Sequence, residues 1–384
     1  MFEGRDQSIW RLTLEPVGVH VAWALLHTDS VGPVSAVAAG VVRDTQDEAA
    51  STFAIAPQRS VDGAIDLERN VLVDPMLERA TARLLGARLV PAVLRNSLNA
   101  TADVHHTVHI AARGWLANVP WEAVSVDDRR NTRMVEKATL VSAMSPGIAA
   151  TRSRLAPVAD PASPGLAIVD AGPAEDPETG ESAIYPGRLP AELIGAGGLD
   201  PGDTVAPGKY SMNAAEAGKA LSARTWSRLM YLGHVASGRP EEPAAAALVF
   251  QRHGIRDPLT AGMWLAEPDR WPAPARVALI GCGSDDARFT EASGLPVAAI
   301  NAGARLVTCT RWTLPTDRRH SAGLPATELA LAVHHAHRSG APIACLRGWQ
   351  LERLAAWKDR PTYETSPLYW AALTSYVTPG GVDE

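Results

Sequence analysis

A histidine and a cysteine follow two apolar segments of the sequence in the same way. The segment RLMYL leads into Gly233 and His234, and the segment RVALI leads into Gly281 and Cys282. A free thiol with a pKa of about 8.5 is mostly protonated at neutral pH, so it attacks a carbonyl efficiently only when a base takes its proton. Imidazole is a suitable base at this pH. The matched placement predicts a dyad in which Cys282 is the nucleophile and His234 the base.

The backbone around the two residues has predicted roles as well. The amides of Val235 and Gly283 are expected to donate hydrogen bonds to the oxyanion that forms on the reacting carbonyl, and such a donor is typically worth about 10²–10³ in rate. The glycines before the dyad are expected to let the chain bend and a substrate backbone approach. Taken singly, a histidine at a strand end is most often structural and a cysteine in a strand most often a small core residue.

The dyad requires elements that bring its two halves together. Apolar periodicity predicts strands at 9–26 (one or two), 106–114, 137–144, 165–172, 226–233, 275–281 and 305–312, and helices at 75–98, 211–223, 293–304 and 326–340. Ser211 or Asn213 is placed to cap the second of these helices. Alternating strands and helices predict a parallel sheet with helices on both faces, whose functional residues gather where the strands end.

Composition limits the other possibilities. The 384 residues are 46% hydrophobic and 20% charged, with a formal net charge of -6, which argues against a nucleic-acid partner. The amino-terminal residues lack the pattern of a secretion signal, and apolar runs are too short to span a membrane, so we expect a cytoplasmic protein. The three cysteines favour reduced thiols. Two of them, Cys309 and Cys345, lack a glycine-flanked strand end and are expected in the core.

Several separated segments resemble one family. YLGHVASG and LIGCGSDD are similar to the histidine and cysteine boxes of the CHAT-domain cysteine peptidases, which belong with caspases and separases. GWLANVPWEAV resembles the upstream box of that family, SGLPVAAINAGARLVTCTRWTLPTD resembles the helix, turn and strand after its cysteine, and SPLYWAALTSYV resembles its terminal box. The resemblance covers roughly residues 75 to 378. One departure is Val235, where the family usually has glycine, and another is Gly283, where an acidic or small polar residue is common.

The resemblance implies a caspase-like α/β fold with a mostly parallel central sheet flanked by helices. It also implies an amino-terminal pseudo-half, predicted at 1–155, and a catalytic half, predicted at 211–384. Residues 156–210 are rich in proline, glycine and aspartate and are expected to form loops around one short strand. The implied activity is that of a cysteine endopeptidase that needs no cofactor. A regulatory partner protein and a role in bacterial defence or cell death are expected from the same resemblance.

Substrate preference is the most open part of the prediction. Trp312 and Asp317 lie in the segment that resembles the wall of the pocket for the residue before the scissile bond, and Asp285 and Asp286 follow the cysteine. Acidic groups there would favour Arg or Lys in the substrate. Ordinary solvated loop aspartates are the alternative. Arg311, if it faced the pocket, would favour an acidic residue instead.

Other residue patterns support weaker hypotheses. Two sets of histidines lack metal-site spacing with a carboxylate and are expected on the surface: His105, His106, His109, His334, His335 and His337. The glycines of IGAGGLDPGD lack the Lys-Ser/Thr of a phosphate loop. The alternative to a peptidase is a catalytically silent CHAT-fold scaffold for protein interaction, which Val235 motivates.

Overall fold

The structure is a computed structural model that describes residues 7–29, 34–55, 70–100, 104–127, 129–144, 147, 150, 155–160, 162–169, 191–194, 199, 204–207, 212–236, 242–252, 255–281, 294–315, 317 and 323–378. The chain divides into two compact units. The first comprises Met1–Gln58, Asp66–Ala143 and Arg347–Ala372, and the second comprises Arg59–Ile65, Met144–Leu346 and Leu373–Glu384. The predicted division into pseudo-half, loops and catalytic half stays a prediction.

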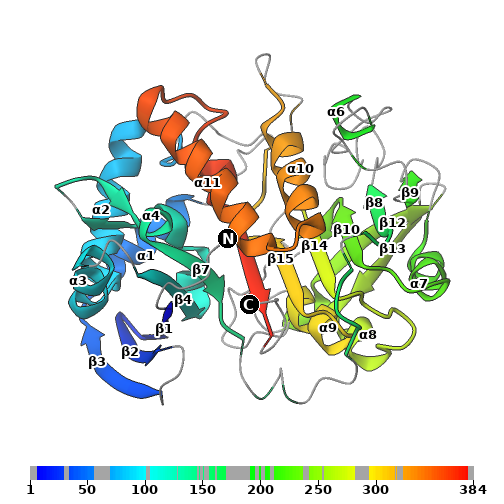
Figure 1. Ribbon diagram of the computed structural model, residues 1–384, viewed down its shortest axis with the longest axis horizontal. Helices are drawn as coiled ribbons and strands as arrows, with labels where there is room; N and C mark the ends of the chain where they lie inside the picture. The colour runs from blue at the N-terminus through cyan, green and yellow to red at the C-terminus, as the bar shows by residue number, and fades with distance from the viewer. Residues whose placement is uncertain are drawn as a thin grey trace. The chain divides into compact units, whose positions relative to one another are not determined.

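The first unit contains strands in the order β3-β2-β1-β4-β7 (Figure 1). β1 pairs antiparallel with β2 and parallel with β4, so the unit mixes a meander with a parallel sheet. The strands are β1 (Gln7–Val17), β2 (His20–Asp29), β3 (Ser35–Val42), β4 (His105–Ala112) and β7 (Ala138–Ser142), with a separate pair of β5 (Ser125–Asp127) and β6 (Thr132–Arg133). The helices are α1 (Gln46–Ile55), α2 (Pro75–Leu89), α3 (Ala92–Ala100), α4 (Met134–Lys137) and α12 (Pro367–Trp370), with short turns η1 (Gly114–Asn118) and η2 (Trp121–Ala123).

A buried ion pair ties three elements of this unit together. Arg133 Nη2 donates to Glu78 Oε2 at 2.8 Å, which joins the start of α4 to α2. Trp357 Nε1, in α11 (Pro342–Asp359), donates to the same oxygen at 3.4 Å. Burial raises the pKa of the Glu78 carboxyl, and the charge of Arg133 partly offsets this effect. Removal of either partner would leave the other charge buried and unpaired, which is far more costly than loss of an exposed pair.

The second unit contains strands in the order β16-β15-β14-β10-β8-β9. All neighbouring pairs except β15 with β16 are parallel. The strands are β8 (Gly165–Val169), β9 (Thr204–Pro207), β10 (Arg228–Leu232), β14 (Arg276–Ile280), β15 (Leu306–Thr310) and β16 (Leu373–Val377). A small antiparallel sheet of β11 (Val235–Ala236), β12 (Ala247–Arg252) and β13 (Ile255–Thr260) lies between β10 and β14 in the sequence.

The two faces of this second sheet are covered differently. Leu229, Tyr231, Val277 and Leu279 pack in one buried cluster with side chains of α7 (Ala214–Ser222), α8 (Ala261–Ala266), α9 (Leu295–Asn301) and β12. The other face contacts α10 (Pro325–Arg338), which lies along β10 and β14 (Figure 1). The described chain of this unit also includes α6 (Ala191–Ile194) and η4 (Pro243–Ala245). A mostly parallel α/β sheet flanked by helices is therefore confirmed.

A capping box fixes the start of α7. Asn213 caps α7: its side chain accepts a hydrogen bond from the Glu216 amide at 2.8 Å, and the Glu216 carboxylate accepts one from the Asn213 amide at 3.0 Å. Ser211 lies outside the described residues.

The single helix predicted at 75–98 is two helices, α2 and α3, because Pro91 cannot continue the hydrogen-bonding pattern of α2. The expected loops of 156–210 fall mostly on residues that the structure does not describe.

Candidate functional site

The predicted strand neighbours are adjacent in the second unit. β10 and β14 pair in parallel, with Leu232 opposite Ile280. The Gly233 amide donates to the Ile280 carbonyl at 3.1 Å, so the ladder continues one residue past β10. Gly233 and Gly281 therefore leave the sheet at the same end, which we call the carboxyl edge, where parallel strands finish. His234 follows Gly233 at this edge, whereas Cys282, Gly283, Asp285 and Asp286 lie outside the described residues.

The backbone of His234 is held by two donors. Its carbonyl accepts a hydrogen bond from the Tyr231 hydroxyl at 2.7 Å and another from the Val249 amide at 3.0 Å. The Tyr231 hydroxyl is also 2.9 Å from the Val249 carbonyl. The end of β10 is therefore joined to β12, and His234 is fixed where the large sheet and the small antiparallel sheet meet.

Val235 begins the small sheet. It pairs with Leu248, and the Val249 amide bonds to the His234 carbonyl beside that pair. In an antiparallel ladder this pattern makes Val235 and Leu248 a non-hydrogen-bonded pair, so the Val235 amide points away from β12. β11 is at the edge of its sheet, in the order β11-β12-β13. The amide predicted to donate to an oxyanion thus faces the open side of β11.

Gly281 has a role within the fold itself, and its expected role in substrate approach stays a prediction. A Cβ atom at this position would lie 2.5 Å from the Gly233 carbonyl oxygen and 2.7 Å from Val235 Cγ2. The missing side chain therefore accommodates the protein's own backbone and the Val235 methyl. The Gly281 carbonyl accepts a hydrogen bond from the Thr310 hydroxyl at the end of β15. Close approach of β10, β11, β14 and β15 explains the glycine without any substrate.

The segment after β15 contains the remaining predicted substrate-binding residues that the structure describes. Trp312 is buried at the end of this strand. The Arg311 guanidinium is buried too, and its Nη1 donates to the Leu373 carbonyl at 2.7 Å. The Asp317 carboxylate is 8% exposed and accepts from the Ala326 and Thr327 amides at 2.8 and 3.0 Å and from the Thr327 hydroxyl at 2.6 Å. These bonds hold Asp317 at the first turn of α10, and its role in substrate binding stays a prediction.

A buried polar cluster lies on the α10 face of the same sheet. His337 Nε2 is 2.8 Å from the Thr308 hydroxyl, and Arg276 Nη1 donates to the His337 carbonyl at 2.8 Å. Burial, together with the nearby charged groups of Arg276, His334 and Arg228, lowers the pKa of His337 to about 3. His337 is therefore neutral at physiological pH and acts as a packing residue under the sheet.

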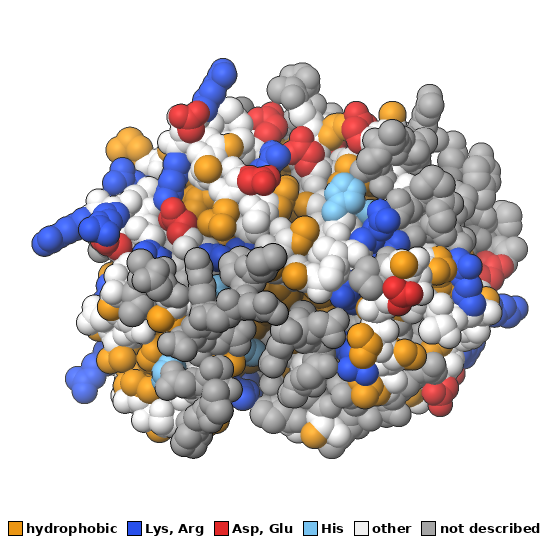
Figure 2. All heavy atoms as spheres, viewed as in Figure 1, with side chains coloured by type: hydrophobic (Ala, Val, Ile, Leu, Met, Phe, Trp, Pro, Cys, Tyr) orange, Lys and Arg blue, Asp and Glu red, His pale blue; other side chains and the backbone are white. Residues whose placement is uncertain are grey.

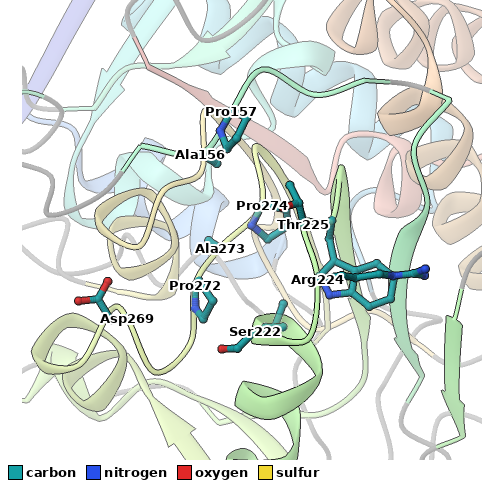
Figure 3. A pocket seen from close by; sticks show the side chains of 11 residues that line it. Ala156, Pro157, Ser222, Arg224, Thr225, Asp269, Pro272, Ala273 and Pro274 are labelled. Carbon is teal, nitrogen blue, oxygen red and sulfur yellow. The ribbon is translucent and has the colours of Figure 1, made fainter.

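A cavity of about 440 Å³ lies at the opposite end of the second unit's sheet (Figure 3). It is lined by residues that precede β10 and β14, among them Arg224, Trp226, Pro272 and Pro274. The Arg224 guanidinium stacks on Trp226, with its carbon 3.9 Å from the ring centroid. The length of β10 separates this cavity from the carboxyl edge, so it is not part of the site around His234.

Two expectations about histidines and cysteines are wrong in part. His106, His334 and His337 are buried rather than on the surface, because His106 shares a strand face with Val108 and Ile110, and the other two lie one turn from buried residues of α10. Cys309 is buried as expected, but Cys345 is exposed. Its apolar neighbours suggested burial, although a helix turns them toward another face. In the part of the chain that the structure describes, His, Cys, Asp and Glu form no group of three that could hold a metal ion.

On the face shown in Figure 2, Lys and Arg side chains of the described residues are interspersed with those of Asp and Glu and do not gather into one basic patch. Within the described residues, no helix is sufficiently long and apolar to cross a membrane.

Comparison with known proteins defines the class of this fold. The solved Saccharomyces cerevisiae separase-securin complex contains a similar chain, with a TM-score of 0.55 and 9% sequence identity. The match covers 98% of this chain and 30% of that one, so the chain spans less than a third of its structural neighbour. The likeness identifies a caspase-like α/β fold, as predicted.

The family follows from the sequence itself. The chain belongs to the CHAT domain family, whose match extends over residues 79–378. No curated protein matches the chain. Strands β1, β2 and β3 precede the matched region, although β1 pairs directly with β4 inside it.

Three site residues were not identified from sequence. Tyr231 and Thr310 lie inside strand patterns, where an aromatic residue and a threonine are ordinary. Val249 belongs to a hairpin that the periodicity did not indicate. One signal was available for Tyr231: its hydroxyl falls in a buried strand, and a buried hydroxyl usually has a hydrogen-bond partner. That rule does not say which partner.

Proposed function

We propose that the protein is a cysteine endopeptidase in which His234 and Cys282 form the catalytic dyad. The observation that carries the proposal is the register of β10 and β14, which brings Gly233 and Gly281 to one edge of the sheet. Covalent geometry keeps the Cα atom of Cys282 about 3.8 Å from that of Gly281. A thiol and an imidazole that leave adjacent strands from equivalent positions are within range to form a pair.

The chemistry follows from these two groups. His234 takes the proton of the Cys282 thiol, and the thiolate attacks the carbonyl carbon of a peptide bond. The carbon–nitrogen bond breaks as His234 gives the proton to the departing amine, which leaves a thioester on Cys282. A water molecule, deprotonated by His234, then attacks the thioester. The carbon–sulfur bond breaks, the carboxyl product leaves, and the Cys282 thiolate takes back the proton from His234. Atoms and charges balance with water as the only co-reactant.

The Val235 and Gly283 amides are the proposed oxyanion donors. The outward direction of the Val235 amide supports this assignment, because such a donor must face the substrate and not a neighbouring strand. The Val235 side chain packs against Gly281, which directs the branched group toward the protein. We therefore infer that valine at this position is compatible with activity.

Substrate and partner are proposed by class. Asp285, Asp286 and Trp312 are proposed to contact the substrate residue before the scissile bond, with Asp317 shaping that segment from α10. The separase neighbour was solved with securin, another protein. We propose that this peptidase also binds a partner protein, which controls it, in the cytoplasm and as part of a bacterial defence or cell-death system.

The test is proteolysis with a matched pair of inactive variants. Purified protein, Cys282→Ala and His234→Ala are each incubated with total cell lysate, and new peptide termini are identified by mass spectrometry. We expect termini that occur only with the unchanged protein, and the residue before each cut gives the specificity. Loss of cleavage by at least about 10³-fold is expected for each variant, since removing a nucleophile or its base is that costly.

An inactive preparation needs a second measurement, because a peptidase held inactive and a CHAT-fold scaffold both leave lysate intact. The rate at which iodoacetamide alkylates Cys282 distinguishes them. A thiol paired with His234 reacts faster at pH 6 to 7 than an ordinary thiol does, whereas a scaffold cysteine follows the titration of a free thiol. An ordinary profile, unchanged in His234→Ala, would exclude the dyad.

A further inference from the structure

We propose that the hydroxyls of Tyr231 and Thr310 are positioning groups for the two halves of the dyad. The inference rests on the proposed function, because it assigns these residues to the geometry of His234 and Cys282. Each hydroxyl bonds to the carbonyl of a peptide group at the carboxyl edge, one beside the base and the other beside the nucleophile. Both side chains are 0% exposed.

Tyr231 acts on the peptide group between His234 and Val235. Its ring lies in the core of the second unit, where it contacts Phe250 edge-on with centroids 5.6 Å apart. The packed ring fixes the hydroxyl beside the His234 carbonyl at 2.7 Å. Because the peptide group is planar and trans, its N–H points opposite to its C=O. A carbonyl held toward Tyr231 and Val249 therefore directs the Val235 amide away from the core.

One hydroxyl consequently fixes two groups of the proposed mechanism. The held carbonyl belongs to His234, the base, and the opposed amide belongs to Val235, the oxyanion donor. The Val249 amide already bonds to the same carbonyl at 3.0 Å, so the carbonyl would keep a partner without Tyr231. One donor is enough to satisfy a buried carbonyl. The second donor, Tyr231, therefore serves to restrict the rotation of this peptide group, whose direction matters for the proposed catalysis.

Thr310 fixes the peptide group that precedes Cys282, the proposed nucleophile. Its hydroxyl donates to the Gly281 carbonyl across the β14–β15 pair. That carbonyl and the Cys282 amide nitrogen belong to one peptide group, so fixing the first constrains the direction in which the chain enters Cys282. Gly281 has no side chain to restrict its own backbone, which makes an external restraint useful at this position.

The two assignments are tested through the reactivity of Cys282, which does not require a known substrate. The unchanged protein, Tyr231→Phe, Thr310→Val and His234→Ala are alkylated with iodoacetamide from pH 5.5 to 9.5, and each cysteine is measured separately by mass spectrometry. Two other cysteines serve as internal standards. Exposed Cys345 reports the reactivity of a thiol that is not part of the dyad, and buried Cys309 stays unlabelled while the second unit is folded.

Matched controls remove a buried hydroxyl elsewhere. Tyr369→Phe deletes a hydroxyl bonded to Tyr363 at 2.8 Å in the first unit. Thr308→Val deletes one from the same strand as Thr310, where it contacts His337. Thr310→Ser retains a hydroxyl at the position under test. The controls and the serine variant are expected to match the unchanged protein at Cys282.

We expect Tyr231→Phe and Thr310→Val to slow alkylation of Cys282 at pH 7 by roughly tenfold, below the 10²-fold that a misplacement of about 1 Å costs. Their pH profiles should move toward that of His234→Ala, with Cys345 unchanged and Cys309 protected. A profile that overlays the unchanged protein overturns the assignment of that hydroxyl, provided that His234→Ala differs. If His234→Ala itself overlays the unchanged protein, the dyad fails, and the proposed function fails with it.

Discussion

At the scale of single residues, the Asp317 carboxylate caps the start of α10, and this contact predicts a measurable contribution to stability. The carboxylate receives two amides and a hydroxyl from the start of α10, as a helix cap does. Asp317→Ala should lower the free energy of unfolding by about 2 kcal/mol, near the upper end for caps, because the donors are buried. Urea titration measures the change. Asp74→Ala, which removes an exposed cap of α2, is the matched control and should cost about 1 kcal/mol.

The same variant separates two roles for Asp317. If its carboxylate contacts substrate, Asp317→Ala changes the residue preferred before the cleaved bond more than it changes stability. If it caps α10, stability falls and the preference is kept. A variant as stable as the unchanged protein would show that the three hydrogen bonds contribute little.

Individual residues also mark the limit of inference from sequence. The positions of Gly233 and His234 were predictable, because apolar strand patterns end at these residues and parallel strands end at one edge. The bonds of Arg311 and Asp317 were not, since their partners lie 62 and 9 residues away in sequence and depend on tertiary packing. The dyad itself remains a proposal, because its cysteine half is outside the described residues.

At the scale of elements, the junction of β10, β11 and β14 depends on Gly281. Gly281→Ala would place a methyl group 2.5 Å from the Gly233 carbonyl oxygen, so the strand ends must separate. We expect a loss of about 2–3 kcal/mol, typical of overpacking, measured by urea titration. Adding Val235→Ala should not restore stability, because the carbonyl contact remains. Gly348→Ala in α11, where a Cβ meets nothing within 4 Å, should instead stabilise by about 0.5–1 kcal/mol.

The elements that were predicted well are those with strong periodicity and recognisable ends. α7 has its Asn213 cap, and β10, β14 and β15 are fully buried, mostly apolar runs. The β12–β13 hairpin was missed because its segment, AALVFQRHGIRDPLT, mixes charges, glycine and proline with a short apolar run. It nevertheless supplies Val249, so an element with a weak sequence signal holds the proposed base in place.

At the scale of the whole molecule, each compact unit contains buried titratable groups that couple its stability to pH. Burial lowers the pKa of His106 and His109 in the first unit and that of His337 in the second. A histidine that is neutral when folded but takes up a proton when unfolded favours the unfolded state below its ordinary pKa. Both units are therefore expected to lose stability on the acid side, and unfolding need not be a single transition.

The second unit gives the sharpest test of this coupling. The folded pKa of His337 is about 3 and its ordinary value is 6.5, so stability is fully present above pH 6.5 and is lost as pH falls toward 3. One group lowers the free energy of unfolding by about 1.4 kcal/mol for each pH unit in that window. His337→Asn should reduce the slope between pH 6 and 4 by nearly this amount, as measured by urea titration at each pH. His335→Asn, an exposed neighbour on α10, should keep the slope, and equal slopes for the two variants would mean that the buried imidazole is not the group that titrates.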